Sequence, residues 1–288
     1  MGGVIQVEPE AFDPSKKIRG DIQIAGFSNN RMGALSGMVE WNHNNLGIRL
    51  QGTLKKGGNL RIPRYYLANT GLEETNFSIL TQYETGKIQW KGTFQLFSSQ
   101  IGLYPGAHLE NLDDLKNAIE SHIPLIPANF TYSIDRPNQT VQHLTGKIEG
   151  TGIWNEKNST KFGLSIQENV RKEFDIRSFL ENPELNLRLL SIIANAHHTI
   201  FWNQSLTWEN GLSLSYQQNI NDPVSSRIFI RNFETLLPAA YSILSLKKNP
   251  RWTHEAGVRY DYRWFQSYYR NNNELIQHER VFSNATFT

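Results

Sequence analysis

Apolar and polar residues alternate along many separate runs of this sequence, and this alternation constrains the fold more than any other feature. The clearest run covers residues 252–264, where Trp252 and Trp264 fall on one face while Arg259 and Asp261 fall on the other. Successive side chains of a β-strand point to opposite faces, so each run predicts a strand with one apolar and one polar face. About eleven antiparallel strands are expected. The candidate runs lie near residues 18–26, 32–41, 46–55, 76–83, 87–97, 139–154, 161–176, 185–202, 208–219, 236–247, 252–264 and 280–288.

The length of the run 252–264 and the position of its aromatic residues favour a strand that crosses a membrane. A strand of this length, rising about 3.3 Å per residue and tilted by roughly 40°, crosses about 30 Å. Trp and Tyr near both ends are typical of the aromatic girdles of outer-membrane barrels, whereas the inner face of a soluble sandwich would carry aliphatic residues. The expected belt includes Trp90, Trp252, Tyr262 and Trp264. We therefore predict an all-β fold, an antiparallel outer-membrane β-barrel.

The composition agrees with this fold class and excludes a helical membrane protein. The mean hydropathy is −0.49, which suits a barrel because only alternate residues face lipid. No stretch reaches the roughly 20 apolar residues that a membrane-spanning helix needs.

The expected connections between strands alternate in length. Short turns are expected at 42–45, 84–86, 155–159, 203–206 and 247–251, and long connections at 56–75, 98–138, 177–184, 220–235 and 265–279. Tight periplasmic turns and long extracellular loops give an outer-membrane barrel this rhythm, which Greek-key sandwiches do not produce so regularly.

The connection 98–138 is predicted to contain a helix. Asn111 can cap it, Asp113 and Asp114 suit its N-terminal end, and Leu112, Leu115 and Ile119 form an apolar stripe. A folded element inside a loop indicates either a gate over the barrel mouth or a loop stiffened for stability, and both interpretations stay open.

The residue types present argue against enzyme chemistry, a resident cofactor and a nucleic-acid partner. The chain has no cysteine, and its 29 basic residues nearly balance 27 acidic ones. Disulfides, thiolate metal sites and cysteine nucleophiles are therefore excluded, and no polyanion partner is indicated. No phosphate-loop, nucleophile-elbow or zinc-protease motif occurs, so no catalytic residue is expected. His197 and His198 are adjacent on an expected strand and point to opposite faces, so no metal site is expected there.

Amphipathic residues in the long connections are the candidates for contact with a ligand. Arginine can bind carboxylate or catecholate oxygens through two hydrogen bonds, and tyrosine offers a flat ring with a hydroxyl group. An aromatic girdle or a brace between loops is the alternative role for the same side chains. The candidates are Arg61, Arg64, Tyr65, Tyr66, Tyr104 and His108.

Four segments, in the right order along the chain, resemble TonB-dependent outer-membrane receptors. Residues 2–7 (Gly-Gly-Val-Ile-Gln-Val) resemble the closing strand of their plug domain, although the Glu-Pro-Glu that follows departs from the usual ending. Residues 64–71 (Arg-Tyr-Tyr-Leu-Ala-Asn-Thr-Gly), 167–174 and 256–263 are similar to stretches of the Bacteroidetes-type receptors.

The resemblance implies a 22-stranded plugged barrel, of which this chain would be a fragment. Residues 1–12 would be the C-terminal end of the plug, and residues 13–288 the first half of the barrel with its extracellular loops. Such a receptor lies in the outer membrane of a Gram-negative bacterium. It binds a scarce nutrient complex such as a ferric siderophore or other iron chelate, and imports it with energy from the TonB–ExbB–ExbD complex. The alternative from another class is a secreted all-β binding or adhesion protein with a lectin-like sandwich.

Overall fold

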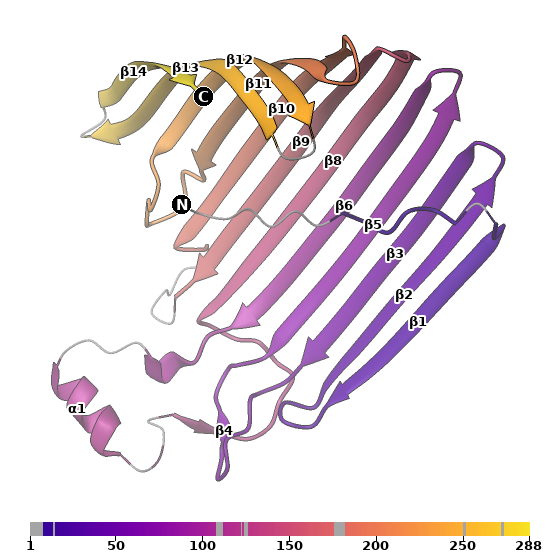
Figure 1. Ribbon diagram of the computed structural model, residues 1–288. Coiled ribbons are helices and arrows are strands. Elements are labelled where there is room, and N and C mark those ends of the chain that lie inside the picture. Colours follow the sequence, from indigo (N-terminus) through magenta and orange to yellow (C-terminus); the bar gives the residue numbers. More distant parts are fainter. Residues whose placement is uncertain are drawn as a thin grey trace.

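One large antiparallel sheet dominates the computed structural model, which describes residues 8–13, 15–107, 112–121, 123, 126–175, 182–249, 252–271 and 274–288. Its twelve strands follow the order β1-β2-β3-β5-β6-β8-β9-β10-β11-β12-β13-β14, so each strand pairs with the next along the chain (Figure 1). Two short strands, β4 and β7, form a separate pair. The strands are β1 Ile18–Phe27, β2 Met32–His43, β3 Leu46–Gly57, β4 Tyr66–Leu67, β5 Leu72–Thr85, β6 Ile88–Gly102, β7 Pro127–Ala128, β8 Asn138–Asn155, β9 Asn158–Phe174, β10 Leu185–Phe201, β11 Leu206–Asn221, β12 Asn232–Asn249, β13 Trp252–Asn271 and β14 Glu274–Phe287; the helices are η1 Pro105–Ala107 and α1 Leu112–Glu120.

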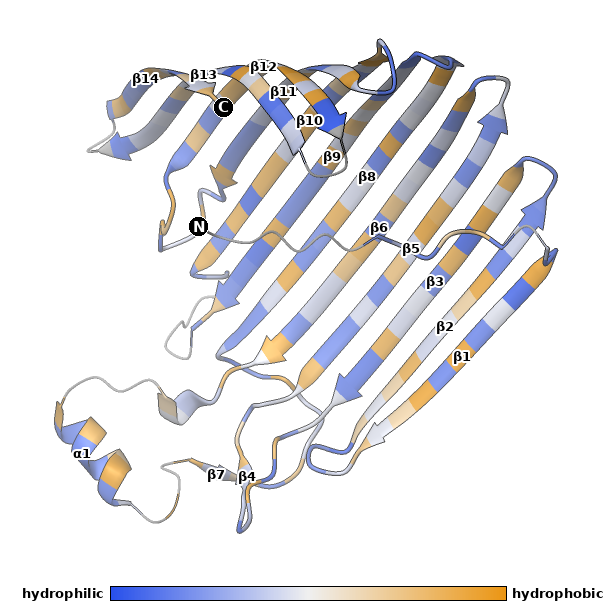
Figure 2. Cartoon of the chain, viewed as in Figure 1, coloured by the Kyte–Doolittle hydropathy of each residue, from blue (hydrophilic) through white to orange (hydrophobic). Residues whose placement is uncertain are grey.

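The alternation predicted from the sequence divides the sheet into two different faces. Cross-strand partners share a face, and the register places Glu40 opposite Arg49, and Tyr260 opposite Ala240. The resulting bands of apolar and polar residues are visible along each strand (Figure 2). The sheet curves into a trough; we call the concave face, which carries Glu40 and Arg49, the inner face and the opposite one the outer face (Figure 1).

The outer face is not covered by a second layer. Among the described residues only two hydrophobic side chains, Leu185 and Ala239, are buried, while many large apolar side chains of the sheet are exposed. A lectin-like sandwich needs two stacked sheets with an apolar core between them, and the described residues do not form one. The predicted fold class is confirmed: the chain has the fold of part of an outer-membrane β-barrel.

Tryptophans mark the two edges of an apolar belt on the outer face. Trp264 lies twelve positions after Trp252 on β13, a distance of about 40 Å along the strand, or about 30 Å across a membrane at 40° tilt. The Trp264 indole donates a hydrogen bond to Glu279 Oε1 (2.8 Å). Six of the seven tryptophans lie at the opposite, short-turn end of the strands: Trp41, Trp90, Trp154, Trp202, Trp208 and Trp252.

One prediction about the connections was wrong. The sheet has twelve strands, in agreement with the expected number of about eleven, but the long connection expected at 265–279 does not exist, because β13 continues to Asn271 and β14 begins at Glu274. The link 28–31 between β1 and β2 is also short, so the short–long rhythm fails at the first and last hairpins. With 20 residues, β13 would span about 50 Å, more than the apolar band of about 25 Å. The far end of β13 therefore lies beyond the apolar band and carries polar residues, and these residues gave the wrong prediction of a loop.

The long connections gather at one end of the sheet, together with α1, β4 and β7 (Figure 1). The predicted helix is confirmed as α1, and its stripe residues Leu112, Leu115 and Ile119 are 74%, 39% and 73% exposed. No helix among the described residues is long and apolar enough to cross a membrane. Residues 8–13 run in extended form across the inner face toward β1 (Figure 1).

Candidate functional site: a loop rim and an inner-face anchor

Asn69 ties two loops together at the long-connection end of the sheet. Its side-chain amide donates hydrogen bonds to the carbonyl oxygens of Leu103 (3.0 Å) and Pro137 (2.7 Å), and its Oδ1 accepts one from the amide of Asp135 (2.8 Å). The side chain is buried, and its backbone has a φ of 54°, a left-handed conformation that asparagine tolerates better than most residues. Asn69 therefore fixes the loop 58–71 against the loop 103–137.

Asn59 makes a second connection between the same loops. Its side-chain amide donates to the carbonyl of Asn129 (3.0 Å), and its Oδ1 accepts from the backbone amide of Thr70 (3.1 Å). The backbones approach so closely here that a Cβ on Gly58 would lie 2.5 Å from the carbonyl oxygen of Thr131. The segment 64–71, singled out by resemblance, thus includes residues that hold the loop rim in shape.

Arginine and aromatic side chains from three loops stack on one another at this rim. The guanidinium carbon of Arg31 lies 4.1 Å from the ring centroid of Phe130, and that of Arg61 lies 5.9 Å from the ring of Tyr66. Phe130 contacts the ring of Tyr66 at 5.6 Å and that of Tyr132 at 4.9 Å, both edge to face. We call these five residues the rim cluster.

The structure brings two of the sequence candidates together in the rim cluster, Arg61 and Tyr66. The backbone of Arg61 exchanges two hydrogen bonds with the side chain of Asn29 (2.7 and 2.9 Å). Arg64 is exposed beside them, and Tyr65 accepts a backbone hydrogen bond from Ile62 (2.9 Å). These contacts are those of a brace between loops, the alternative role considered for these side chains, and they leave the guanidinium groups of Arg61 and Arg64 facing solvent.

Tyr104 stands apart from the rim cluster, because its hydroxyl oxygen accepts a hydrogen bond from the amide of Ile126 (3.3 Å) and so braces the helical loop. His108 lies outside the described residues. Sequence reasoning missed Arg31, Phe130 and Tyr132, because they join the cluster through contacts between distant loops. Tyr132, for example, donates a hydrogen bond to the carbonyl oxygen of Arg31 (2.9 Å), which lies 101 positions earlier in the chain. No local pattern signals such a contact between distant loops.

The rim cluster is suited to an anionic ligand with flat surfaces. Exposed guanidinium groups donate paired hydrogen bonds to carboxylate or catecholate oxygens, and the adjacent rings offer stacking area. The described residues contain no group of three or more His, Asp or Glu side chains that could hold a metal ion.

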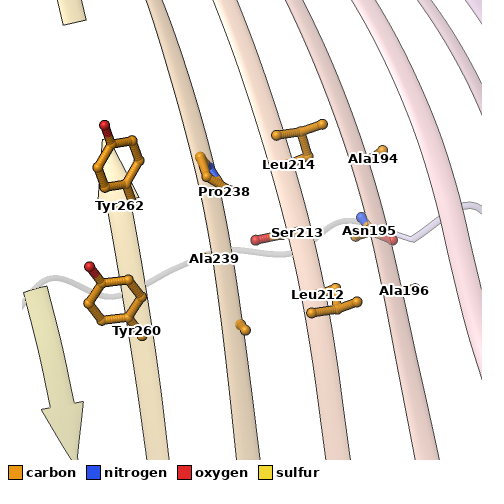
Figure 3. A pocket seen from close by; sticks show the side chains of 11 residues that line it. Ala194, Asn195, Ala196, Leu212, Ser213, Leu214, Pro238, Ala239, Tyr260 and Tyr262 are labelled. Carbon is orange, nitrogen blue, oxygen red and sulfur yellow. The ribbon is translucent and has the colours of Figure 1, made fainter. Parts of the chain in front are cut away.

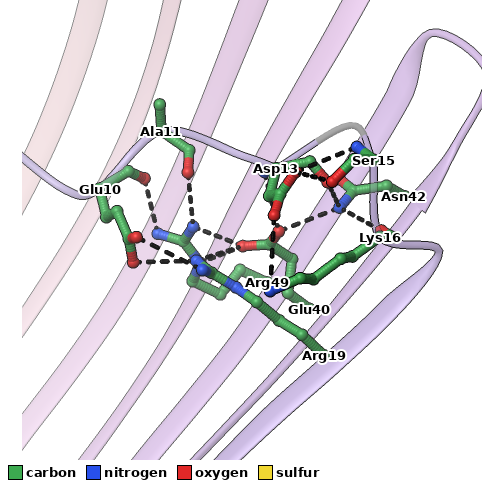
Figure 4. Close-up of polar contacts among 9 residues, drawn as sticks. All are labelled: Glu10, Ala11, Asp13, Ser15, Lys16, Arg19, Glu40, Asn42 and Arg49. Carbon is green, nitrogen blue, oxygen red and sulfur yellow. Dashed lines mark hydrogen bonds and ion pairs between the residues drawn. The ribbon is translucent and has the colours of Figure 1, made fainter.

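A buried ion cluster forms the second functional feature, on the inner face. Glu40 is fully buried; it accepts hydrogen bonds from Arg49 Nε (2.8 Å) and Nη2, from Arg19 (3.2 Å) and from the amide of Asn42 (2.9 Å) (Figure 4). β1, β2 and β3 therefore meet at a single carboxylate. A charge buried this deeply is stable only while its partners remain.

The same cluster holds residues 10–13 on the inner face. Arg49 donates to the carbonyl oxygens of Glu10 (2.8 Å) and Ala11 (3.4 Å), and Glu40 accepts from the amide of Asp13 (3.2 Å). The Phe12 ring lies 4.9 Å from the Arg49 guanidinium carbon. Most of these hydrogen bonds are made to backbone atoms of residues 10–13. The side chains of the sheet therefore bind the segment chiefly through its extended backbone.

Two carboxyl groups of the docked segment are stabilised in their charged form. A hydrogen bond and the positive charge of Arg19 lower the pKa of Glu10, which lies 2.9 Å from Arg19 Nη2. Hydrogen bonds from the Ser15 side chain and backbone lower the pKa of Asp13.

The remaining polar candidates lie on the strands. His197 bonds Tyr241 (2.7 Å) and His198 bonds Thr160 (2.9 Å). Because the two histidines are adjacent on β10, these partners lie on opposite faces, as predicted.

The charged residues of β13 pair on the inner face. Arg259 forms an ion pair with Asp261 (2.6 Å), and Arg263 donates to the Thr235 hydroxyl oxygen (3.1 Å). Arg259 and Asp261, which the alternation of this strand places on one face, therefore pair with each other.

No protein-family model and no curated protein sequence matches this chain. Solved structures of similar fold include three proteins named as import receptors or transporters. The open form of the ferric-catecholate import receptor Fiu from E. coli aligns with a TM-score of 0.63 at 10% identity, over 94% of this chain and 50% of that one. The ferric yersiniabactin uptake receptor FyuA from Yersinia pestis aligns at 0.60 and 10% identity, over 96% of this chain and 44% of that one. For the unliganded ferric citrate transporter FecA the values are 0.57 and 12%, over 93% and 40%.

At these identities the likeness establishes the fold alone. The chain spans half the length of these receptors or less.

Proposed function

We propose that this chain belongs to a TonB-dependent transporter of a Gram-negative outer membrane. Residues 13–288 supply the first half of its barrel, and residues 1–12 the C-terminal end of its plug. The transporter binds an iron chelate, such as a ferric siderophore, at the loop rim. It imports the chelate with energy from the TonB–ExbB–ExbD complex, without changing covalent bonds in the ligand.

The observation that supports this most is the rim itself. Two loops are locked together by Asn59 and Asn69, and exposed arginines flank aromatic rings at the end of the sheet opposite the short turns. A preorganised cationic surface at a barrel mouth suits capture of a dilute anionic ligand, because its loops and side chains lose little further conformational entropy on binding.

Two further observations support the class of protein. The outer face carries an apolar belt bounded by tryptophans, as a lipid-facing barrel surface does. The extended segment 10–13 is bound to inner-face side chains, which suits the junction between a lumenal domain and the barrel. The proposed candidates for ligand contact are Arg61, Arg64, Tyr65 and Tyr66, with Tyr104 and His108 from the following loop.

The test is uptake by the whole gene product that contains this chain. It is expressed in an iron-starved outer-membrane host, and accumulation of radioactive iron is followed with a ferric catecholate and with ferric citrate, in the presence and absence of functional TonB. We expect TonB-dependent accumulation of one chelate. Equal accumulation with and without TonB, or none of either chelate by a protein correctly inserted in the outer membrane, would contradict the proposal.

A matched pair of variants tests the rim. Arg61→Ala/Arg64→Ala should raise the half-saturating chelate concentration at least tenfold, because a single charge-assisted hydrogen bond contributes roughly 1.5–3 kcal/mol and about 1.4 kcal/mol corresponds to tenfold. Arg188→Ala is the control, since Arg188 is an exposed arginine paired with Glu168 on the outer face, away from the rim. An equal change in both variants would show that the rim arginines do not contact the chelate.

A further inference from the structure

A shallow apolar groove of about 550 Å³ runs along β12 on the outer face of the sheet. Small side chains of β12 form its floor, leucines of β11 form one wall and tyrosines of β13 form the other (Figure 3). We call it the β12 groove and define it by Leu212, Leu214, Pro238, Ala240, Tyr260 and Tyr262. Strands lie about 4.8 Å apart, so the backbones of the two walls are separated by about 10 Å. Between their side chains there is room for one hydrocarbon chain but not for a helix, which is about 10–12 Å across.

One backbone hydrogen bond is missing at the floor of the groove. The ladder between β12 and β13 has no pair at Leu237 and Pro238, although the register is the same on both sides of this gap. Gly257 exchanges two backbone hydrogen bonds with Thr288, so odd-numbered residues of β13 face β14 and even-numbered residues face β12. The carbonyl oxygen of Tyr262 therefore points at Pro238, which has no N–H to donate.

The missing bond lies within the apolar belt, where lipid tails cannot replace it. Proline is normally confined to edge strands and bulges, whereas β12 lies between β11 and β13. Tyr262 is two positions from Trp264, which marks the edge of the belt on the side of the long connections. Within the described residues no side chain donates to the Tyr262 carbonyl, and the hydroxyl groups of Tyr260 and Tyr262 have no hydrogen bond. Three polar atoms without partners therefore border an otherwise apolar groove.

We propose that the β12 groove binds a membrane lipid whose acyl chain carries a hydroxyl group close to its carbonyl end. The hydrocarbon lies over Pro238 and Ala240, between the two walls. The lipid hydroxyl donates to the Tyr262 carbonyl oxygen and accepts from a tyrosine hydroxyl, because a hydroxyl group has one donor and two acceptor positions. The position of the hydroxyl follows from depth, since only the first carbons of an acyl chain lie as near to the edge of the belt as Tyr262. The inference rests on the proposed membrane setting of the chain, but not on what the loop rim binds.

Retention of two matched lipids tests the proposal. The chain is folded into phosphatidylcholine vesicles that contain equal traces of two phosphatidylethanolamines, identical except that one has a hydroxyl group on the third carbon of each acyl chain. The vesicles are dissolved in mild detergent, and native mass spectrometry gives the amount of each lipid that stays bound. We expect about ten times more of the hydroxylated lipid. This ratio corresponds to about 1.4 kcal/mol, the contribution expected of one or two neutral hydrogen bonds.

Two variants separate recognition of the hydroxyl from binding of the hydrocarbon. Pro238→Val supplies the missing N–H to the Tyr262 carbonyl, so it should remove the preference while both lipids are still retained. Ala240→Leu fills the floor of the groove and should lower retention of both lipids. Ala256→Leu is the control, because it makes the same change on the outer face of β13, opposite Leu244 and away from the groove. It should leave both amounts unchanged.

A carbonyl label detects the proposed hydrogen bond in the unmutated chain, so this readout does not depend on how the variants fold. Tyrosine labelled with carbon-13 at its carbonyl, combined with nitrogen-15 arginine, selects the two places where arginine follows tyrosine, Tyr262–Arg263 and Tyr269–Arg270. The hydroxylated lipid should shift the NMR signal of the Tyr262 carbonyl more than the matched lipid does. The signal of Tyr269, which lies beyond the belt, should stay in place.

Equal retention of the two lipids would overturn the proposal, as would retention of neither by the folded chain. A preference that survives Pro238→Val would overturn it too, because the lipid hydroxyl would then be bound elsewhere. The same holds for a Tyr262 carbonyl signal that responds equally to both lipids or to neither. Iron uptake by the whole gene product is measured separately, so a failure of lipid recognition is distinguishable from a failure of the proposed transport.

Discussion

The inner and outer faces of the sheet belong to the same strands, but they differ in which kinds of side chain they bury and expose. On the outer face, large apolar side chains such as Leu212 (64% exposed) and Val258 (45%) face outward without any protein cover. On the inner face the fully buried side chains include Glu40, a charged group held by two arginines. A sheet with an uncovered apolar outer face and an ion-paired inner face is stable where lipid takes the place of a hydrophobic core and polar networks take the place of side-chain packing.

The largest expected effect is on the inner face. Glu40→Ala should destabilise the protein by about 3 kcal/mol or more, because it leaves Arg49 and Arg19 without their shared carboxylate. The free energy of unfolding in lipid vesicles measures the loss, and limited proteolysis should show residues 8–16 released. Val39→Ala, the outer-face neighbour on β2, is the control and should leave the segment protected. A segment equally resistant in both variants would mean that the ion cluster does not anchor it.

A pair of neighbouring substitutions compares the two faces directly. Leu214 and Ser213 are neighbours on β11 (Figure 3). Leu214→Arg puts a charge in the middle of the apolar belt and should cost about 2–4 kcal/mol, whereas Ser213→Arg, which points to the inner face, should cost much less. Urea unfolding of both variants in vesicles measures the difference. Equal costs would show that the belt does not face lipid.

The same chemical change at two tyrosines should give a smaller contrast. Tyr241→Phe removes the hydroxyl that bonds His197 on the inner face (2.7 Å) and should cost about 1 kcal/mol. Tyr260 is 51% exposed on the outer face, and its hydroxyl has no hydrogen bond within the described residues, so Tyr260→Phe should be close to neutral. Denaturation midpoints compare the two, and a larger loss at Tyr260 would reverse the assignment of faces.

The smallest expected effect is a dependence of segment docking on pH. Arg19 lowers the pKa of Glu10, and Ser15 lowers that of Asp13. A lowered pKa in the folded state means that the stabilisation is present above the ordinary carboxyl range of about 4 and is lost as pH falls through the lowered value. Protease accessibility of residues 8–16 should therefore rise modestly at acidic pH. Glu10→Gln should reduce this dependence, and an unchanged pH profile would show that Glu10 does not contribute.

Much of the fold was predictable because its signal is local. Alternation in the run 252–264 assigned both faces of β13 correctly, since the period of two follows from strand geometry alone. The same reasoning failed at 265–279. There the strands extend past the apolar belt, and polar residues on both faces, such as Ser267 and Gln266, remove the contrast on which alternation depends.

The candidate site was only partly predictable. Arg61 and Tyr66 were selected as amphipathic loop residues, and they do lie together in the rim cluster. Their partners Arg31, Phe130 and Tyr132 come from loops on either side of them in the sequence. Whether any of these residues contacts a ligand stays a prediction.

The sequence by itself determined which elements form and which side of each strand is apolar, because both depend on neighbours along the chain. The tertiary structure alone decided what those strands bring together. Glu40 meets both Arg19 and Arg49, and Arg31 stacks on Phe130, only because strand register and loop closure place distant segments beside one another. Such contacts are set by hydrogen bonding between strands and by the tying of loops at Asn59 and Asn69, and these interactions leave no periodic trace in the sequence.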